Sequence, residues 1–136
     1  MQTKTLSLLF LRNNEEILLA MKKRGFGEGR WNGVGGKVEE GETVEAAMVR
    51  ETQEEIGVTP TQYEKVADIR FDEFFKGEPT LMHVHVYIAT EWEGTPAETE
   101  EMAPKWVHFR APFGSGKILS MAVLGRRFLL KSAHGP

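Results

Sequence analysis

The chain has 136 residues, of which 40% are hydrophobic, and this length and content suit one globular domain with a real core. It contains no cysteine, which excludes a disulfide framework and thiol chemistry and fits a cytoplasmic protein. No apolar run approaches the ~20 residues of a membrane span, and the first residues lack the plan of a secretion signal. The net charge of −3 argues against binding of long nucleic acid through a basic field.

Charge is unevenly distributed along the chain. Residues 1–101 carry all 20 acidic side chains and 11 of the 17 basic ones, whereas residues 102–136 carry six bases and no acid. No repeat or low-complexity linker divides the sequence. We therefore expect a single domain over residues 1–136, with an atypical part at 107–136.

Two short apolar runs open the chain, at 6–11 and 17–21, and the polar segment 12–15 between them predicts a β-hairpin. Residues 22–24 are all basic, and six glycines follow within residues 25–36, which predicts a long shaped loop. This loop is not a P-loop, because no Gly-Lys-Ser/Thr opens a helix. Its bases suit either a polyphosphate or a plain basic surface, and its place before an acidic helix favours the polyphosphate.

The segment 44–56 predicts a helix, with Thr43 as its N-cap and Gly57 as its C-terminal stop. At 3.6 residues per turn, one face of this helix changes from apolar to acidic along its length. The apolar half is formed by Val44, Ala47 and Met48, and the acidic half by Glu51, Glu54 and Glu55.

The acidic half is unfavourable for an isolated helix, because the carboxylates lie near the negative end of the dipole. At an effective dielectric near 20, each like-charge pair about 5–6 Å apart would cost roughly 3 kcal/mol. Arg50 can reach Glu54 and offset one charge, but it cannot serve all three. Either the side chains splay into water as a solvated face, or a hard divalent cation lies among them.

Further strands are predicted at 66–75, 81–89 and 105–109, with a turn at 77–79 and a polar, acidic loop at 91–101 that contains Glu98. Within 81–89 the side chains alternate, so Val84, Val86 and Ile88 share one face while His83, His85 and Tyr87 share the other. Two histidines on one face could bind a metal, but we interpret them as a half-exposed strand face. A turn at 112–116 and a helix over 118–131 complete an α/β plan.

The spacing from Gly36 to Val58 resembles the Nudix box, the signature of hydrolases that act on nucleoside diphosphates linked to another group. Glu42 follows Gly36 after five residues, and seven more residues lead to the segment Arg50-Glu51-Thr52-Gln53-Glu54-Glu55-Ile56-Gly57-Val58. Every specified position matches except Thr52, where the family usually has a bulky aliphatic residue. The resemblance implies a Nudix fold, a mixed β-sheet sandwiched between α-helices.

Stretches outside the box, at 21–33, 77–82, 85–86 and 94–96, resemble the Nudix hydrolases of oxidised purine nucleoside triphosphates. This implies a monomeric, Mg²⁺-dependent pyrophosphohydrolase, in which Mn²⁺ could also serve. Its substrates would be purine nucleoside triphosphates such as 8-oxo-dGTP, and its role would be cleaning of the nucleotide pool. The alternatives are hydrolysis of a dinucleotide or a nucleotide sugar, or a Nudix-like domain that only binds a ligand.

The resemblance also implies roles for individual residues. The metal ligands would be the Gly35 carbonyl, Glu51, Glu54, Glu55 and Glu98. Arg50 would fix the helix carboxylates, and Glu51, with Glu98 as the rival, would act as the general base. The substrate-binding residues would be Lys22 and Lys37 at the phosphates, Asn32 at the base edge, the pocket walls Phe26, Met82 and Trp106, and the loop residues Val34, Gly35 and Gly36.

The resemblance fades near the C-terminus. After Trp106 the proteins that it resembles have a Trp and paired Asp residues that grip the oxidised purine, but here no Trp and no Asp follows Trp106. The tail is either a diverged end or the translation of a shifted frame. We therefore expect a weaker preference for oxidised over normal purines than the resemblance alone would imply.

Overall fold

The computed structural model describes residues 1–24 and 28–108. Along this part of the chain the elements are β1 (Gln2–Leu11), β2 (Glu16–Lys22), β3 (Trp31–Asn32), β4 (Val34–Lys37), α1 (Val44–Ile56), β5 (Thr59–Phe75), β6 (Glu78–Glu93) and β7 (Met102–His108). No helix within these residues is long and apolar enough to cross a membrane.

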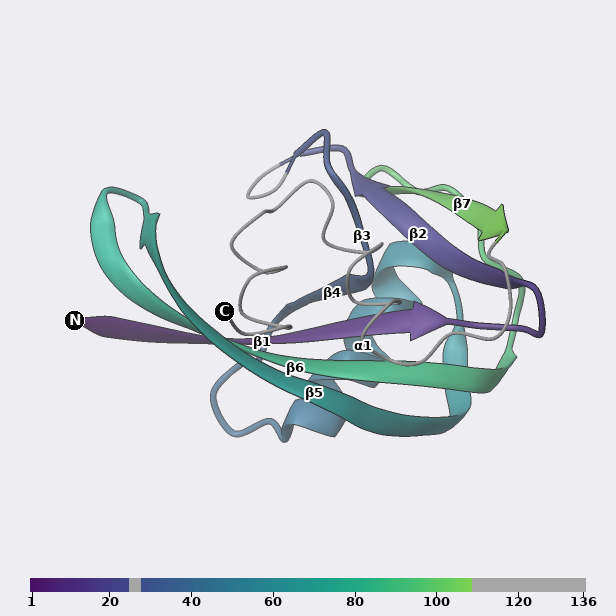
Figure 1. Ribbon diagram of the computed structural model, residues 1–136, viewed down its shortest axis with the longest axis horizontal. Coiled ribbons are helices and arrows are strands. Elements are labelled where there is room, and N and C mark those ends of the chain that lie inside the picture. The colour runs from purple at the N-terminus through teal and green to yellow at the C-terminus, as the bar shows by residue number, and fades with distance from the viewer. Residues whose placement is uncertain (25–27, 109–136) are drawn as a thin grey trace.

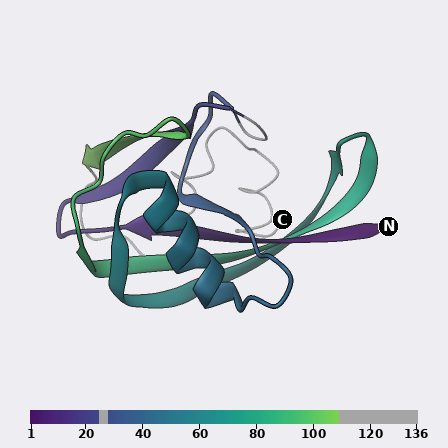
Figure 2. The same cartoon turned by 180° about the vertical axis from the view of Figure 1, so that it is seen from behind.

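The strands form two sheets (Figure 1). The first has four strands in the order β4-β1-β6-β5, and it is mixed because β1 runs parallel to β6 while the other pairs are antiparallel. The second is antiparallel, with the order β3-β2-β7. The helix α1 lies across one face of the four-stranded sheet and contacts β4, β1 and β5 (Figure 2).

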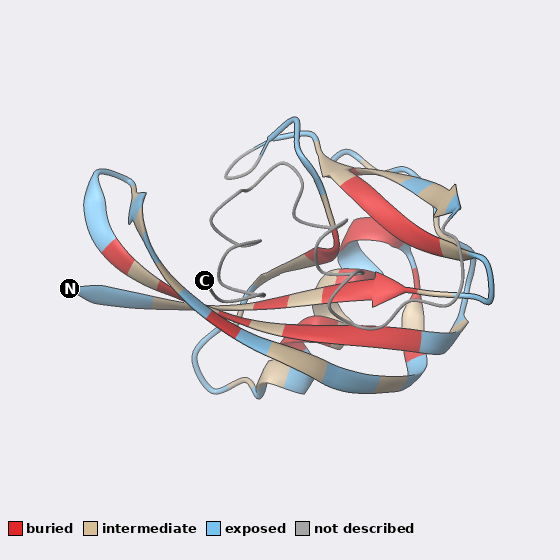
Figure 3. Ribbon diagram, viewed as in Figure 1, coloured by how far each residue is buried: buried red, intermediate tan, exposed pale blue. Residues whose placement is uncertain are grey.

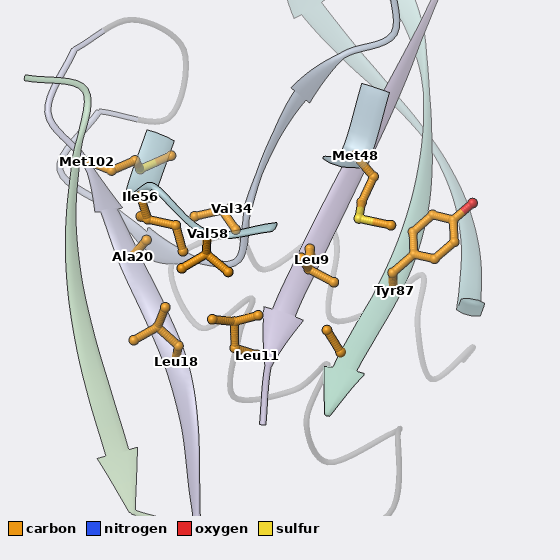
Figure 4. Close-up of a cluster of buried hydrophobic side chains, with 11 residues drawn as sticks. Leu9, Leu11, Leu18, Ala20, Val34, Met48, Ile56, Val58, Tyr87 and Met102 are labelled. Atoms are coloured by element: carbon orange, nitrogen blue, oxygen red, sulfur yellow. The ribbon is translucent and has the colours of Figure 1, made fainter. Parts of the chain in front are cut away.

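Buried side chains lie on both faces of the four-stranded sheet, because neighbouring residues of a strand project to opposite sides. On one face, Phe10 packs with Val84, Val86 and Ile88. On the α1 face the second cluster includes Leu9, Leu11, Val34, Met48, Ile56 and Tyr87 (Figure 4). Burial is accordingly concentrated in β1, β2, β6 and α1 (Figure 3).

The helix prediction is confirmed at both ends. The Thr43 hydroxyl accepts a hydrogen bond from the Ala46 N–H at 3.1 Å, and Gly57 takes the left-handed conformation with φ 74°. Thr52, at the position of the usual aliphatic residue, is fully buried, and its hydroxyl donates to the Met48 carbonyl at 2.8 Å. The polar group is therefore satisfied inside the core.

The predicted hairpin at the N-terminus is only partly correct. The Asn13 side chain accepts from the N–H groups of Glu15 and Glu16 at 2.9 and 2.7 Å, which makes a tight turn. The two strands then share a single bridge, between Arg12 and Ile17, before they enter different sheets. Both edges of β1 are paired with other strands, β4 on one side and β6 on the other, so β2 is not its neighbour in the sheet.

All five predicted strands begin earlier than expected, with the largest difference in β5, which begins at Thr59 rather than at residue 66. The register between β5 and β6 shifts at Pro60, Gln62 and Lys65, and these irregularities hide the start of β5 from a period-two pattern. The turn between β5 and β6 is confined to residues 76–77, and β7 begins at 102 rather than 105. The expected turn at 112–116 and helix at 118–131 lie outside the described residues. The mixed sheet and the α/β character are confirmed.

Candidate active site

The carboxylate of Glu55 is the most buried acid of the helix. Its side chain is almost wholly enclosed, and one oxygen accepts a hydrogen bond from the Gly35 N–H on β4 at 2.9 Å. Burial raises the pKa of Glu55 to about 8, although the Gly35 hydrogen bond and the charge of Lys22 lower it. The charges of Glu51 and Glu101 raise the pKa further. A cation beside Glu55 would stabilise its ionised carboxylate, which burial disfavours.

One guanidinium organises the other acids. Arg50 donates from Nε and Nη2 to the two oxygens of Glu42 at 2.7 and 3.0 Å, a bidentate pair. Its Nη1 donates to Glu51 at 2.8 Å and to Glu54 at 3.3 Å. A further contact runs from Nη2 to the Lys37 carbonyl at 3.2 Å. Arg50 thus reaches Glu54 as predicted, and Glu42 and the β4 end hold it in place.

The charge network sets the ionisation of these groups. Hydrogen bonds from Arg50 hold the pKa of Glu42 down to about 2, so Glu42 is ionised and acts as an anchor for the guanidinium. Burial raises the pKa of Glu51, whereas the hydrogen bond from Arg50 lowers it. Glu54 is more than half exposed. The three predicted acids therefore lie in one group that runs from the closed Glu55 to the open Glu54.

The loop before β7 is tied to the C-terminal end of α1. The Ala97 N–H donates to the Ile56 carbonyl at 3.0 Å, and the Thr99 hydroxyl donates to the Glu55 carbonyl at 2.8 Å. These bonds satisfy carbonyls of the last helical turn. Later in the same loop, the charge of Glu101 raises the pKa of both Glu51 and Glu55.

Glu98 stands apart from this arrangement. Its carboxylate pairs with the Lys23 ammonium, and 63% of its side chain is exposed. The sequence predicts Glu98 from this loop, whereas in the structure the charge of Glu101, which lies 3.8 Å from Arg24, acts on Glu51 and Glu55. The available signal was only that several acids share the segment, since the register of the loop on α1 depends on hydrogen bonds of Ala97 and Thr99.

A cavity adjoins the acid group at Gly35 and Gly36. Its polar wall contains Lys22, Arg30 and Asn32, and its apolar wall is formed mainly by Leu6, Leu8, Phe71, Val84 and Met102. Cavities that combine apolar walls with a few polar groups are typical of small-molecule sites. This one suits a ligand with a flat apolar part and an anionic part. Arg30 was missed as an individual residue, although it lies in the basic, glycine-rich loop.

The predicted substrate-binding residues fall into different surroundings. Lys22, Asn32, Gly35 and Gly36 line the cavity, and the Asn32 side-chain oxygen accepts from the Gly33 N–H at 2.9 Å. Phe26 lies outside the described residues. The other four residues are not among the described residues that line the cavity.

Two of these four, Val34 and Met82, are buried in the core, and Lys37 is exposed and contributes its carbonyl to Arg50. Trp106 stacks on Trp92, with ring centroids 5.9 Å apart, and packs against the α1 side of the core. Trp106 is thus partly buried against the core, and the pocket role that the resemblance implied for it stays a prediction.

The fold agrees with the comparisons to known proteins. The family profile described as NUDIX domain matches residues 1–126, and the chain belongs to the Nudix family. Among solved structures, the MutT NUDIX hydrolase from Burkholderia pseudomallei superposes with a TM-score of 0.69 at 24% identity, covering 97% of this chain and 98% of that one. This likeness establishes the fold.

Two curated relatives are more similar in sequence. The oxidized purine nucleoside triphosphate hydrolase of Mus musculus is 50% identical over 100 residues, 74% of this chain and 63% of the relative. The protein of the same name from Danio rerio is 49% identical over 104 residues, 76% of this chain and 65% of the relative. The chain therefore spans just under two thirds of the length of these relatives.

Proposed function

We propose that this protein hydrolyses purine nucleoside triphosphates, including oxidised ones such as 8-oxo-dGTP, to the monophosphate and pyrophosphate. The proposal depends mainly on the buried Glu55 carboxylate, which accepts a hydrogen bond from Gly35. Gly35 also lines the cavity that contains Lys22, Arg30 and Asn32. The names of the mouse and zebrafish relatives support this substrate class. Such an activity would clean the nucleotide pool, and we propose that a cytoplasmic monomer of one domain, residues 1–136, performs it.

The donor set fits a hard divalent cation, Mg²⁺ or alternatively Mn²⁺. Carboxylate and carbonyl oxygens are the ligands that Mg²⁺ prefers, and a bound cation would offset the burial that raises the pKa of Glu55. We propose Glu51, Glu54, Glu55 and the Gly35 carbonyl as ligands, with Glu101 in place of Glu98. The bound metal would neutralise the polyphosphate and lower the pKa of an attacking water.

The remaining groups of the chain have separable roles. Arg50 holds the Glu51 carboxylate at 2.8 Å, which orients it to take the proton of the attacking water. Lys22 and Arg30 line the cavity and would offset the charge of the phosphates. Asn32 lies on the same wall, where its amide would hydrogen-bond the base edge. The apolar wall would exclude water from the face of the base.

The test is a substrate panel with Mg²⁺, Mn²⁺ or a chelator, with products identified by phosphorus NMR. The panel contains dGTP, 8-oxo-dGTP, a pyrimidine triphosphate, a dinucleotide polyphosphate and a nucleotide sugar. We expect pyrophosphate and monophosphate from the purine triphosphates, only with metal, and loss of at least about 10²-fold in turnover in Glu54→Gln. If only the dinucleotide or the nucleotide sugar is cleaved, the proposal is wrong and that compound represents the substrate class. If no compound is cleaved, the protein is better explained as a domain that binds a ligand without hydrolysing it.

A further inference from the structure

Three potential metal ligands gather on the four-stranded sheet outside the acid group. Asp68 on β5 lies opposite His85 on β6, and His83 is two residues away on the same strand. The Asp68 carboxylate is 2.6 Å from His83 Nε2 and 3.9 Å from His85 Nδ1. The two imidazole centroids are 4.2 Å apart, and one ligand atom from each residue falls within a 4.8 Å group. Small side-chain movements would bring these atoms to the separations of about 3.3 Å between ligands of a tetrahedral zinc ion.

The cluster lies on the opposite face of the sheet from the cavity. Val84 lines the cavity, and its neighbours His83 and His85 project to the other side because strand residues alternate. The acid group is also separate, because Glu51 lies beside Gly36 on β4, and β1 intervenes between β4 and β6. The His-Asp cluster therefore does not belong to the candidate active site.

The ligand types select the ion. Two imidazoles and one carboxylate suit Zn²⁺ and related transition metals, whereas Mg²⁺ prefers oxygen ligands throughout. The side chains are also accessible, with 19% of His83, 14% of His85 and 37% of Asp68 exposed. An ion can therefore enter from solvent, and water can complete a tetrahedral site.

We propose that Asp68, His83 and His85 bind one transition-metal ion of the Zn²⁺ class and thereby clamp β5 to β6. In the metal-free arrangement, Lys65 and Arg70 contact the Asp68 carboxylate at 3.1 and 3.8 Å. Both are long, exposed side chains, so the ion displaces them at little cost. The site acts independently of hydrolysis, and its test needs no substrate.

The test follows the imidazole signals of the full chain by long-range ¹H–¹⁵N NMR during titration with Zn²⁺. We expect one equivalent to shift His83 and His85, and to leave the exposed His108 unchanged. Competition with a chromophoric chelator should show at least about tenfold weaker binding in Asp68→Asn and in His85→Ala, with unchanged binding in His108→Ala. Circular dichroism verifies that each variant is folded.

Several outcomes would overturn the proposal. Histidine signals that stay unchanged through excess Zn²⁺ would show that the cluster is only a hydrogen-bonded network. Equal Zn²⁺ affinity in folded Asp68→Asn and His85→Ala would place the ion elsewhere. A shift of the same signals by Mg²⁺ alone, at the same concentration, would show that the ligand set does not select a transition metal.

Discussion

The α-carbon of Gly36 lies against the Glu51 carboxylate, so closely that a Cβ added at Gly36 would be 2.8 Å from the Glu51 carboxyl carbon. The neighbouring Gly35 is packed against backbone instead, because its added Cβ would be 1.9 Å from the Ser7 carbonyl oxygen. A carboxylate at the end of a side chain can move aside, whereas a strand backbone cannot. The two glycines are therefore required for different reasons.

Gly36→Ala should remain folded but lose activity, because the methyl group displaces Glu51 from its place beside Arg50. We expect a melting temperature close to that of the parent and a fall in turnover of about 10²-fold. Gly35→Ala should instead unfold or melt far lower. Calorimetry and steady-state kinetics on both variants provide the check, and parental turnover in Gly36→Ala would show that the position of Glu51 is not critical.

Arg50→Lys should lower turnover about tenfold or more, although the lysine retains the positive charge. An ammonium cannot pair with both oxygens of Glu42 and also hold Glu51, as the guanidinium does. Because Arg50 acts through these carboxylates, kcat should fall and the Mg²⁺ concentration for half-maximal rate should rise, with KM little changed. Arg70→Lys on β5 serves as the control. Equal kcat in the two lysine variants would contradict the positioning role.

Glu101→Gln and Glu98→Gln separate the two acids of the loop before β7. The charge of Glu101 acts on Glu51 and Glu55, whereas Glu98 pairs with Lys23 at the surface. We expect Glu101→Gln to reduce turnover by at least about tenfold at limiting Mg²⁺, and Glu98→Gln to change it less than about threefold. The reverse order of effects would restore Glu98 to the site.

The stability of the metal-free protein should depend on pH through Glu55. Its folded pKa is about 8 and its ordinary value is 4.5, so between these pH values the folded state keeps a proton that the unfolded chain releases. Stability is therefore full below about pH 4.5 and falls as the pH rises toward 8, by on the order of a few kcal/mol. Urea unfolding at pH 5.5 and 8 in chelator measures this change.

Two variants and one ligand complete that experiment. Glu55→Gln should flatten the dependence on pH, since an amide does not titrate, whereas Glu54→Gln should retain it because Glu54 is largely exposed. Mg²⁺ should restore stability at pH 8, because it binds the ionised carboxylates of the folded state only. A parental slope in Glu55→Gln would assign the titration to another group.

The helix was predictable to the residue because its signals are local. Thr43, Gly57 and the 3.6-residue spacing of the acids all act within a few positions of one another. Helical spacing could not predict the anchoring of Arg50 by Glu42, because Glu42 precedes the helix and the pair spans eight residues. The choice between Glu98 and Glu101 likewise depends on hydrogen bonds between a loop and carbonyls more than 40 residues away.

Strand partners were the least predictable part of the fold. Alternation correctly placed Val84 and His85 on opposite faces of β6, but it could not show that Asp68 would lie opposite His85. The bulges in β5 interrupt the alternation of apolar and polar residues, so the register between β5 and β6 could not be derived from it. The sequence placed two histidines on one strand face. Only the structure shows that the third potential ligand, Asp68, lies beside them on another strand.

Under the proposed function, the polar wall of the cavity would recognise the base of the nucleotide. Discrimination between 8-oxo-dGTP and dGTP is a difference in transition-state binding, and it depends on groups that pair with the altered ring edge. Among the described residues, the cavity is lined by Lys22, Arg30 and Asn32 but by no carboxylate. Asp72 does not supply one, because its neighbour Phe71 lines the cavity and Asp72 projects to the other face of β5.

We therefore expect both nucleotides to be hydrolysed, with a kcat/KM ratio for 8-oxo-dGTP over dGTP well below the hundreds. The proteins that this chain resembles carry paired Asp residues after the position of Trp106, and this chain has none there. The loss of such hydrogen bonds would remove about 1–3 kcal/mol of discrimination. Asn32→Ala should raise KM for both purines more than for a pyrimidine triphosphate, because we propose that its amide, on the cavity wall, hydrogen-bonds the purine edge. If this kcat/KM ratio is in the hundreds for the parent protein, residues other than those of the described cavity wall recognise the oxidised base.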